Sequence, residues 1–295
     1  MEDKSFRPKL PPWIRVRVSC GALSEKVDGL VKGLALNTVC QGAQCPNQGE
    51  CWGRGTAAFM ILGNRCTRNC KFCAVGHVER PFPPDPEEPV RLAEAAAQMK
   101  LKYVVVTSVT RDDLPDGGAS AFAATTAALK KAVPGIKVEI LTPDFMGVER
   151  DIAASLQGAD VFNHNLETVE RMAPLVRSKA EYRRSLSVLS AAVRITGGKT
   201  PVKSGIMVGL GETDSEVERT ILDLREAGVS MLTIGQYLPP SKEHWKLDRY
   251  VTPEAFDAFG KYAREIGFTH VASGPLVRSS YYAVQLADKG GIEKK

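Results

Sequence analysis

The sequence predicts an α/β fold, a partial (β/α)6 barrel of the TIM type with an N-terminal extension and a short C-terminal tail. Between residues 57 and 275, short apolar segments alternate about six times with amphipathic ones, as parallel strands and crossover helices do. This part is shorter than the about 250 residues of a closed eight-unit barrel, which favours an open barrel. An open doubly wound sheet is the alternative, but no G-x-G-x-x-G turn follows the first expected strand.

The strands are expected at short apolar runs. The first run, 57–62, ends at Gly63, as a buried strand would. Functional groups in such folds gather on the loops after the strands, so the loop after this run is expected at the rim of the barrel. Later runs of the same kind occupy residues 102–107, 138–141, 160–163, 202–208, 231–234 and 268–272.

Helices are expected between these strands, and the last two have the clearest signals. Thr213 or Asp214 can cap one of them, and Gly228 stands where a helix end favours a left-handed residue. Thr252 caps the other, and Pro253 suits its first turn. The expected helices cover residues 87–100, 117–131, 148–157, stretches up to 195, 213–228 and 252–267.

The N-terminal part lacks this alternation. Residues 1–33 are Pro-rich and then polar, so no regular element is expected there. Residues 38–54 are rich in Gly, Gln and Cys, which suits a loop wrapped around a ligand. Cys20 is interpreted as a small buried residue. The expected divisions are an extension (1–56), the barrel (57–275) and the tail (276–295).

Composition and charge bound the class of protein. The chain has 295 residues, of which 43% are apolar and 25% charged, as in an ordinary globular protein. No apolar run is long enough to span a bilayer, and no export signal opens the chain, so a cytoplasmic protein without a membrane role is expected. The net charge of +5 is too mild to indicate nucleic acid, although it could assist docking of an acidic partner or electron donor. An ordinary solvated surface explains it as well.

Cysteine spacing is the strongest chemical signal. Cys66, Cys70 and Cys73 form C-x3-C-x2-C. A second trio, spaced C-x4-C-x5-C, consists of Cys40, Cys45 and Cys51. Reduced cysteines in a cytosolic chain favour metal or redox roles over disulfides.

Iron–sulfur clusters explain the two trios better than zinc does. Structural zinc is closed by four Cys or His ligands, and the only nearby candidate for a fourth ligand is His77, which follows Cys73. Three thiolates on a [4Fe–4S] cluster leave one iron free for a chelating substrate or cofactor. The spacing therefore predicts a cluster with an open iron.

The segment Cys66 to Cys73, with Phe72 before its last cysteine, resembles the signature of radical S-adenosylmethionine (SAM) enzymes. More closely, the chain resembles the lipoyl synthase family over nearly its whole length. The sequence departs from the family pattern at Pro239, where Gln is common, and in its short N-terminal arm. The matching segments are 40–47 with Cys51 and Trp52, 107–109, 111–118, 163–168, 203–205, 209–212, 235–238, 249–253 and 278–281.

This resemblance implies a reaction and its cofactors. Two [4Fe–4S] clusters and SAM are implied, with Cys66, Cys70 and Cys73 on the cluster that binds SAM. The other cluster is implied to supply two sulfur atoms to carbons 6 and 8 of a protein-bound octanoyl-lysine. The ligands implied for this auxiliary cluster are Cys40, Cys45, Cys51 and Ser279; without the resemblance, Ser279 is more simply a turn hydroxyl.

Other polar residues are candidates on weaker grounds. Asn163, Asn165 and Glu167 follow the fourth expected strand, where SAM is expected, although turn or capping roles explain them as well. His164, His244 and the charge cluster Arg111, Asp112 and Asp113 are expected to be structural. Further candidates for contacts with SAM or substrate are Phe72, Ser108, Arg177, Lys203 and Arg278.

The partners follow from the implied reaction. They are an octanoylated lipoyl carrier (a glycine-cleavage H protein or a 2-oxoacid dehydrogenase acyltransferase subunit), a low-potential donor such as ferredoxin or flavodoxin, and an iron–sulfur carrier protein. A monomer is expected. Alternatives are another sulfur-inserting radical enzyme, such as biotin synthase or a methylthiotransferase, and a non-catalytic ferredoxin-like or zinc-binding protein. The second trio disfavours biotin synthase, and a methylthiotransferase would add an RNA-binding domain.

Overall fold

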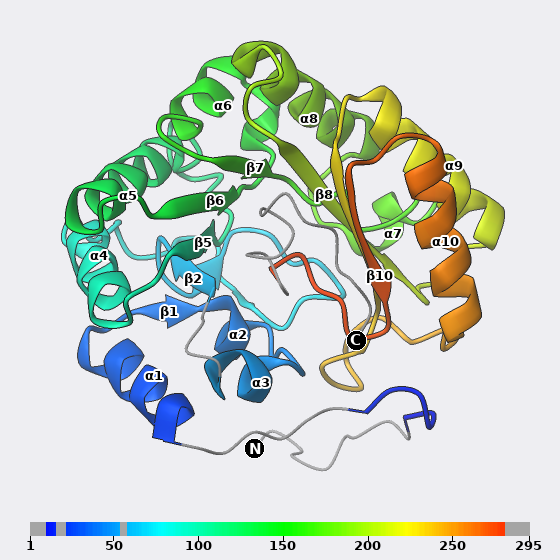
Figure 1. Ribbon diagram of the computed structural model, residues 1–295, viewed down its shortest axis with the longest axis horizontal. Helices are drawn as coiled ribbons and strands as arrows, with labels where there is room; N and C mark the ends of the chain where they lie inside the picture. The colour runs from blue at the N-terminus through cyan, green and yellow to red at the C-terminus, as the bar shows by residue number, and fades with distance from the viewer. Residues whose placement is uncertain (1–9, 16–21, 54–57, 281–295) are drawn as a thin grey trace.

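The computed structural model describes residues 10–15, 22–53 and 58–280. Its centre is an eight-stranded sheet in the order β1-β2-β5-β6-β7-β8-β9-β10, curved into an open barrel (Figure 1). Only β1 (Asn37–Thr38) is antiparallel to its neighbour; the other strands run parallel. The parallel strands are β2 (Ala58–Ile61), β5 (Tyr103–Ser108), β6 (Lys137–Leu141), β7 (Val161–Asn163), β8 (Val202–Val208), β9 (Met231–Gln236) and β10 (His270–Gly274).

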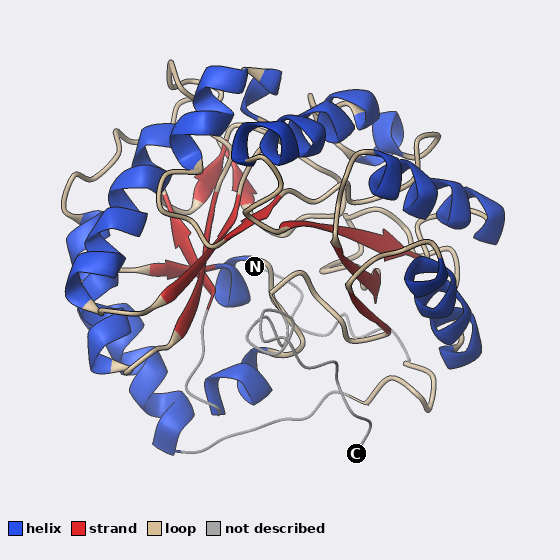
Figure 2. Cartoon of the chain, turned by 45° about the horizontal axis from the view of Figure 1, so that its top comes forward, coloured by secondary structure: helices blue, strands red, loops and turns tan. Residues whose placement is uncertain are grey.

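Helices cover the outer face of the sheet, as Figures 1 and 2 show. Their apolar sides are buried against the strands, which explains why the strand sequences are apolar nearly throughout. The helices are α4 (Glu88–Gln98), α5 (Ala119–Ala132), α6 (Glu149–Ser155), α7 (Ala173–Val176), α8 (Tyr182–Thr196), α9 (Asp214–Glu226) and α10 (Pro253–Glu265), with a 3-10 turn η1 (Phe145–Gly147) after β6. The expected alternation of parallel strands and helices is confirmed.

The caps expected from the sequence are present. The Thr213 hydroxyl accepts from the Glu216 N–H, and the Glu216 carboxylate accepts from the Thr213 N–H, so α9 begins with a capping box. The Thr252 hydroxyl accepts from the Ala255 N–H at the start of α10. No helix among the described residues is long and apolar enough to cross a membrane.

The extension is more ordered than expected. Helix α1 (Ala22–Gly33) buries Val27 and Val31, although its region was expected to lack a regular element. The short helices α2 (Val39–Gly42) and α3 (Gln48–Gly53) occupy a region expected to be a loop. Thr38 caps α2 through its hydroxyl, and a cap of this kind can start a helix too short to show periodicity.

The described part of the tail, residues 276–280, lies close to β9 and to the extension. Gly235 in β9 passes so near the tail that a Cβ there would stand 2.1 Å from the Val277 carbonyl oxygen. The Asn47 side-chain amide donates to the Leu276 carbonyl at 2.6 Å. Extension and tail, far apart in sequence, therefore meet beside the barrel. Cys20, Tyr281 and the expected boundary at 56–57 lie outside the described residues.

Candidate functional site

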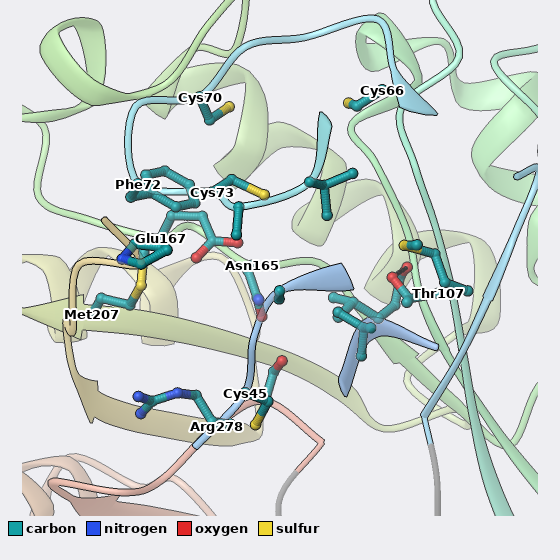
Figure 3. A pocket seen from close by; sticks show the side chains of 18 of the residues that line it. Cys45, Cys66, Cys70, Phe72, Cys73, Thr107, Asn165, Glu167, Met207 and Arg278 are labelled. Carbon is teal, nitrogen blue, oxygen red and sulfur yellow. Dashed lines mark hydrogen bonds between the residues drawn. The ribbon is translucent and has the colours of Figure 1, made fainter. Parts of the chain in front are cut away.

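A cavity of about 980 Å³ opens at the carboxyl ends of the strands (Figure 3). Residues from the extension, the barrel and the tail line it together. Five of the six cysteines in the two trios are on its wall; Cys51 is not. The candidate residues that line it are Cys40, Cys45, Cys66, Cys70, Phe72, Cys73, Ser108, Asn165, Glu167, Arg177, Arg278 and Ser279.

The cysteine loop 63–78 follows β2 directly, as expected. Its base is a two-residue ladder in which β3 (Arg65–Cys66) pairs with β4 (Gly76–His77). The Val78 N–H donates to the Cys66 carbonyl at 3.0 Å, and the Cys73 N–H donates to the Cys70 carbonyl at 3.0 Å. These bonds hold the three cysteines on one compact arch.

A buried ionic clamp fixes the middle of this arch. The Arg68 guanidinium donates in bidentate fashion to Asp112, at 2.8 Å from Nε and from Nη2. It also donates to Asp144, at 3.0 Å from Nη1 and 2.7 Å from Nη2. Because these carboxylates follow β5 and β6, the clamp joins the cysteine loop to two strand ends. Arg68 and Arg184 hold the pKa of Asp144 well below its usual range, although burial opposes them.

The outer side of the arch is held by the long loop after β9. The backbone N–H of Trp245 donates to the Lys71 carbonyl at 2.8 Å, and the Lys71 ammonium lies 5.3 Å from the centre of the Trp245 ring. The His244 ring contacts the Cys73 carbonyl through Nε2 at 3.2 Å and Ser241 through Nδ1 at 2.8 Å. The structure thus gives His244 the hydrogen-bond partners that the sequence did not reveal. Arg68 and Trp245 also hold the cysteine arch in place, and sequence reasoning missed both.

Backbone N–H groups already face two of the sulfur atoms. The Arg68 N–H donates to the Cys66 sulfur and the Ser178 N–H to the Cys70 sulfur, each at 3.4 Å. Burial raises the pKa of Cys70, and it raises the pKa of Cys73 to about 12. Such thiols remain protonated until a metal or another positive charge stabilises the thiolate.

The second trio meets the tail at the same cavity. Cys40 is buried, Cys45 is half-buried, and neither forms a disulfide. The Arg278 side chain lies next to Cys45 in Figure 3, and the charge of a Cys45 thiolate would raise the pKa of this guanidinium, which burial lowers. Ser279 and Ser280 line the cavity beyond it. Oxygen and sulfur donors from both ends of the chain therefore face one space.

Unpartnered polar groups mark another part of the wall. Among the described residues, the Ser108 hydroxyl and the Asn165 side-chain oxygen are buried without a hydrogen-bond partner. Glu167 lies close to Asn165 in Figure 3, at a left-handed backbone position with φ 70°. Burial raises the pKa of Glu167, and Arg177 and Asn165 oppose this effect. Buried polar groups without partners are costly in protein interiors, so these fit a polar ligand.

Two residues that were expected to contact SAM or substrate, Asn163 and Lys203, do not line the cavity. Lys203 and Asn163 pair across β7 and β8 and are fully buried. The Lys203 ammonium binds Glu139 at 2.9 Å, and the Asn163 amide donates to Glu139 at 2.8 Å. Lys203 is the second residue of β8, near the end of the strand opposite the rim. The side chains of Lys203, Asn163 and Glu139 therefore fill the interior of the barrel and do not line the cavity. The expectation that Asn163 and Lys203 contact SAM or substrate stays a prediction, and the contacts of these two residues with Glu139 do not support it.

The expectation that His164 is structural agrees with its contacts. Its ring is buried, with Nδ1 2.9 Å from the Thr142 carbonyl and Nε2 3.0 Å from the Ser185 hydroxyl. Arg177 donates to the same hydroxyl at 2.9 Å and to the Leu166 carbonyl at 3.2 Å. Burial lowers the pKa of His164 to about 4, so the ring is neutral at pH 7.

The donor set fits iron–sulfur clusters. No three His, Cys, Asp or Glu side chains in the described part of the chain stand close enough to surround a single metal ion. A [4Fe–4S] cluster offers four separate irons, so its thiolates need only face one cavity. Three free thiols on one arch meet this requirement.

Comparison with known proteins gives the class first. The family model for the radical SAM superfamily matches residues 60–224. Two similar solved structures are methylornithine synthase (TM-score 0.53, 13% identity, covering 91% of this chain and 92% of that one) and the FeFe-hydrogenase maturase HydG from Carboxydothermus hydrogenoformans (TM-score 0.55, 13% identity, covering 90% and 77%). These two share the fold. The chain is thus a radical SAM protein with an open α/β barrel.

Its relatives define the family within this class. A lipoyl synthase of Caldanaerobacter subterraneus subsp. tengcongensis is 55% identical over 276 residues, which cover 92% of this chain and 95% of the relative. A lipoyl synthase of Rubrobacter xylanophilus is 54% identical over 275 residues, which cover 92% and 85%. The chain belongs to the lipoyl synthase family. It is accordingly an enzyme that uses SAM and [4Fe–4S] clusters.

Proposed function

We propose that the cavity is where an octanoyl chain, amide-linked to a lysine of a carrier protein, receives sulfur at carbons 6 and 8. The observation that supports this most is that five of the six cysteines in the two trios, the tail serines Ser279 and Ser280, and the unpartnered groups of Ser108 and Asn165 line one cavity. When bound, the SAM-binding cluster supplies hydrogen abstraction from unactivated carbon, and the auxiliary cluster supplies sulfur. One cavity for both clusters would let the same acyl chain lose hydrogen and receive sulfur at carbons 6 and 8 without leaving the protein.

The chain's own residues divide between these tasks. Cys66, Cys70 and Cys73 hold the SAM-binding cluster. Ser108, Asn165 and Glu167 offer polar atoms to SAM, with Arg177 beside them as a source of positive charge. Arg68 touches none of the reacting groups in this scheme; it positions the arch through its carboxylate clamp.

The other ligands come from both ends of the chain. Cys40, Cys45, Cys51 and Ser279 hold the auxiliary cluster in this proposal. Support for Ser279 comes from the tail, which carries it to the wall shared with Cys40 and Cys45. A hydroxyl or alkoxide oxygen is a harder ligand than a thiolate and suits a bond that must open when sulfur leaves. The proposed division into extension (1–56), barrel (57–275) and tail (276–295) follows these roles.

The partners extend the same proposal. The acyl carrier is a glycine-cleavage H protein or a 2-oxoacid dehydrogenase acyltransferase subunit. A ferredoxin or flavodoxin delivers electrons, and an iron–sulfur carrier rebuilds the auxiliary cluster. The protein acts in the cytoplasm as a monomer.

The test is anaerobic turnover of an octanoyl-lysine peptide with SAM and a reductant. The wild type is expected to yield 5′-deoxyadenosine and lipoyl peptide and to hold about eight irons. Ser279→Ala is expected to lower lipoyl product at least about tenfold because the fourth ligand is lost. Ser280→Ala, the matched control on the same turn, is expected to retain it.

Cysteine variants separate the two roles. Cys40→Ala should still form 5′-deoxyadenosine without lipoyl product, whereas Cys66→Ala should form neither. Normal lipoyl product from Cys40→Ala would contradict the sulfur-donor role. Zinc without sulfide in the purified protein would contradict both cluster assignments.

A further inference from the structure

Lys71 lies on the outer side of the cysteine arch, between two of the proposed cluster ligands. It follows Cys70 directly, and Cys73 comes two residues after it; Figure 3 shows both cysteines on one arch. Cys70, Phe72 and Cys73 line the cavity, whereas Lys71 does not line it and is exposed. A protein that binds over Lys71 would therefore come next to a cluster ligand and leave the cavity free for SAM and substrate.

The segment that ends α7 brings a second lysine to the same place. The Val176 carbonyl accepts from the Lys71 N–H at 2.8 Å. Two residues further on, the Ser178 N–H donates to the Cys70 sulfur at 3.4 Å. Lys179 comes directly after Ser178 and is exposed, so it lies beside the proposed ligand Cys70 at the protein surface.

The loop after β9 brings a third lysine. The backbone N–H of Trp245 donates to the Lys71 carbonyl at 2.8 Å, and the Lys71 ammonium lies against the Trp245 ring. Lys246 comes directly after Trp245 and is exposed. Three segments that are far apart in the sequence thus place exposed lysines around one end of the arch.

The surface around these lysines is positive and partly apolar. None of the three ammonium groups forms an ion pair with a described residue. Within residues 69–72, 174–179 and 242–246, Glu243 is the one acidic residue, and it is next to Lys242 in the chain. Leu175, on α7, is 45% exposed. This surface, named the lysine patch, consists of Lys71, Leu175, Lys179 and Lys246.

We propose that the lysine patch binds the negative face of a small acidic electron-transfer protein of low potential. One electron then passes from this carrier, which is oxidised, to the SAM-binding cluster, which is reduced. The inference rests on the proposed function, which requires such a donor. Electron-transfer complexes bury little surface, below about 1,200 Å², and opposite charges steer their encounter. Lysines without ion pairs around one exposed leucine suit a contact of this kind.

The first measurement is binding of flavodoxin, an acidic carrier of this class, to the anaerobic holoenzyme. Lys179→Glu/Lys246→Glu is expected to raise the Kd at least about tenfold at low ionic strength, because attraction becomes repulsion. The Kd of the wild type should rise with added salt, and that of the variant should change less. Unchanged affinity in this variant would overturn the proposal.

The control variant is Lys131→Glu/Lys199→Glu, which changes the net charge by the same amount. Both lysines are exposed, near the C-terminal ends of α5 and α8, and outer helices of such a barrel end opposite the rim that carries the arch. Its Kd for flavodoxin is expected to stay within about twofold of the wild type, because steering depends on local charge. An equal loss in both double variants would show an effect of net charge alone and would overturn the lysine patch.

The second measurement is 5′-deoxyadenosine formation on the octanoyl-lysine peptide with two reductants. With flavodoxin, Lys179→Glu/Lys246→Glu should have a KM for flavodoxin about tenfold above that of the wild type. With reduced methyl viologen, a small cation that needs no docking surface, its rate should match that of the wild type. Equal losses with both reductants would indicate damage to the arch and contradict a docking role.

A third arm separates other occupants and the proposed function itself. An octanoylated H protein replaces the peptide, with methyl viologen as reductant. If the lysine variant is slow only with this substrate, the patch binds the acyl carrier and the proposal is wrong. If the wild type forms no 5′-deoxyadenosine with methyl viologen, the proposed function fails. If it does and flavodoxin binds the lysine variant normally, only the lysine patch fails.

Discussion

Polar side chains around the cavity fall into two groups. Arg68 and His164 are bonded to protein partners on several sides, so they position the wall. Ser108 and Asn165 each keep a buried oxygen without a described partner, and these are the groups left for a ligand. This difference in hydrogen bonding separates the residues that hold the wall from the residues that we propose bind a ligand.

His164 makes stability depend on pH. Its pKa is about 4 in the folded protein and about 6.5 in an unfolded chain, so the unfolded chain binds more protons between these values. The contribution of His164 is therefore full above pH 6.5 and decreases as the pH falls toward 4. We expect a loss of about 1 kcal/mol between pH 7.0 and 5.5. Denaturant unfolding at the two pH values measures it.

The matched variants test the cause of this loss. His164→Gln should be less stable at both pH values but should lack the extra loss at pH 5.5. His270→Gln, at the edge strand β10, should keep the wild-type difference. An undiminished pH effect in His164→Gln would show that another group titrates.

At the scale of elements, the parts predicted from sequence are those with a repeating pattern. The apolar strands and the capped helices α9 and α10 are confirmed within a few residues. Helix α1, with 12 residues, was missed. The other missed elements are short: β1, β3 and β4 have two residues each, α2 has four and α3 has six. Elements of this length are held by contacts distant in sequence, so no local pattern reports them.

In the site, too, local sequence patterns could be predicted, and contacts that depend on the fold could not. The cysteine trios could be predicted as ligands because ligand spacing is local. Asn163 and Lys203 were expected near SAM but are not among the residues that line the cavity, because a position in a strand does not say which layer of the barrel a side chain fills. The clamp between Arg68, Asp112 and Asp144 spans three strand–loop units, and only the fold brings its charges together.

The tail segment depends on a glycine in β9. Gly235→Ala would place a methyl group 2.1 Å from the Val277 carbonyl oxygen, so the tail must move. We expect unfolding free energy to fall by about 1–3 kcal/mol and lipoyl product to be lost as Ser279 leaves the cavity. Denaturant unfolding and peptide turnover measure the two effects.

Gly274→Ala is the control from the neighbouring strand. A Cβ there meets the Val277 side chain at an ordinary 3.6 Å, so stability and turnover should stay near wild type. If Gly235→Ala keeps full lipoyl activity, the position of the tail is not needed for sulfur insertion.

At the scale of the whole molecule, the sheet ends at β1 on one side and at β10 on the other. Extension and tail lie by this open side and are joined there by the bond between Asn47 and Leu276. A ligand set drawn from Cys40, Cys45, Cys51 and Ser279 would join the same two segments again. The proposed auxiliary cluster thus fastens the two ends of the chain together.

Amide hydrogen exchange tests this coupling. Loading the auxiliary cluster is expected to slow exchange in residues 39–51 and in residues 276–280 together, because the same irons hold both. In loaded Ser279→Ala, only residues 39–51 should slow. Slower exchange in the extension of the wild type without any change in the tail would contradict a ligand from the tail.

The Arg68 clamp has a consequence for the proposed binding of a cluster by the arch of Cys66, Cys70 and Cys73. Asp112 and Asp144 already restrict the segment between Cys66 and Cys70. The loss of conformational entropy on ordering this segment therefore occurs when the chain folds and not when metal binds. Iron meets a preorganised site, and preorganisation strengthens binding without adding a single contact to the ligand. Because the clamp is buried, salt screens it little, and this gain in affinity is insensitive to ionic strength.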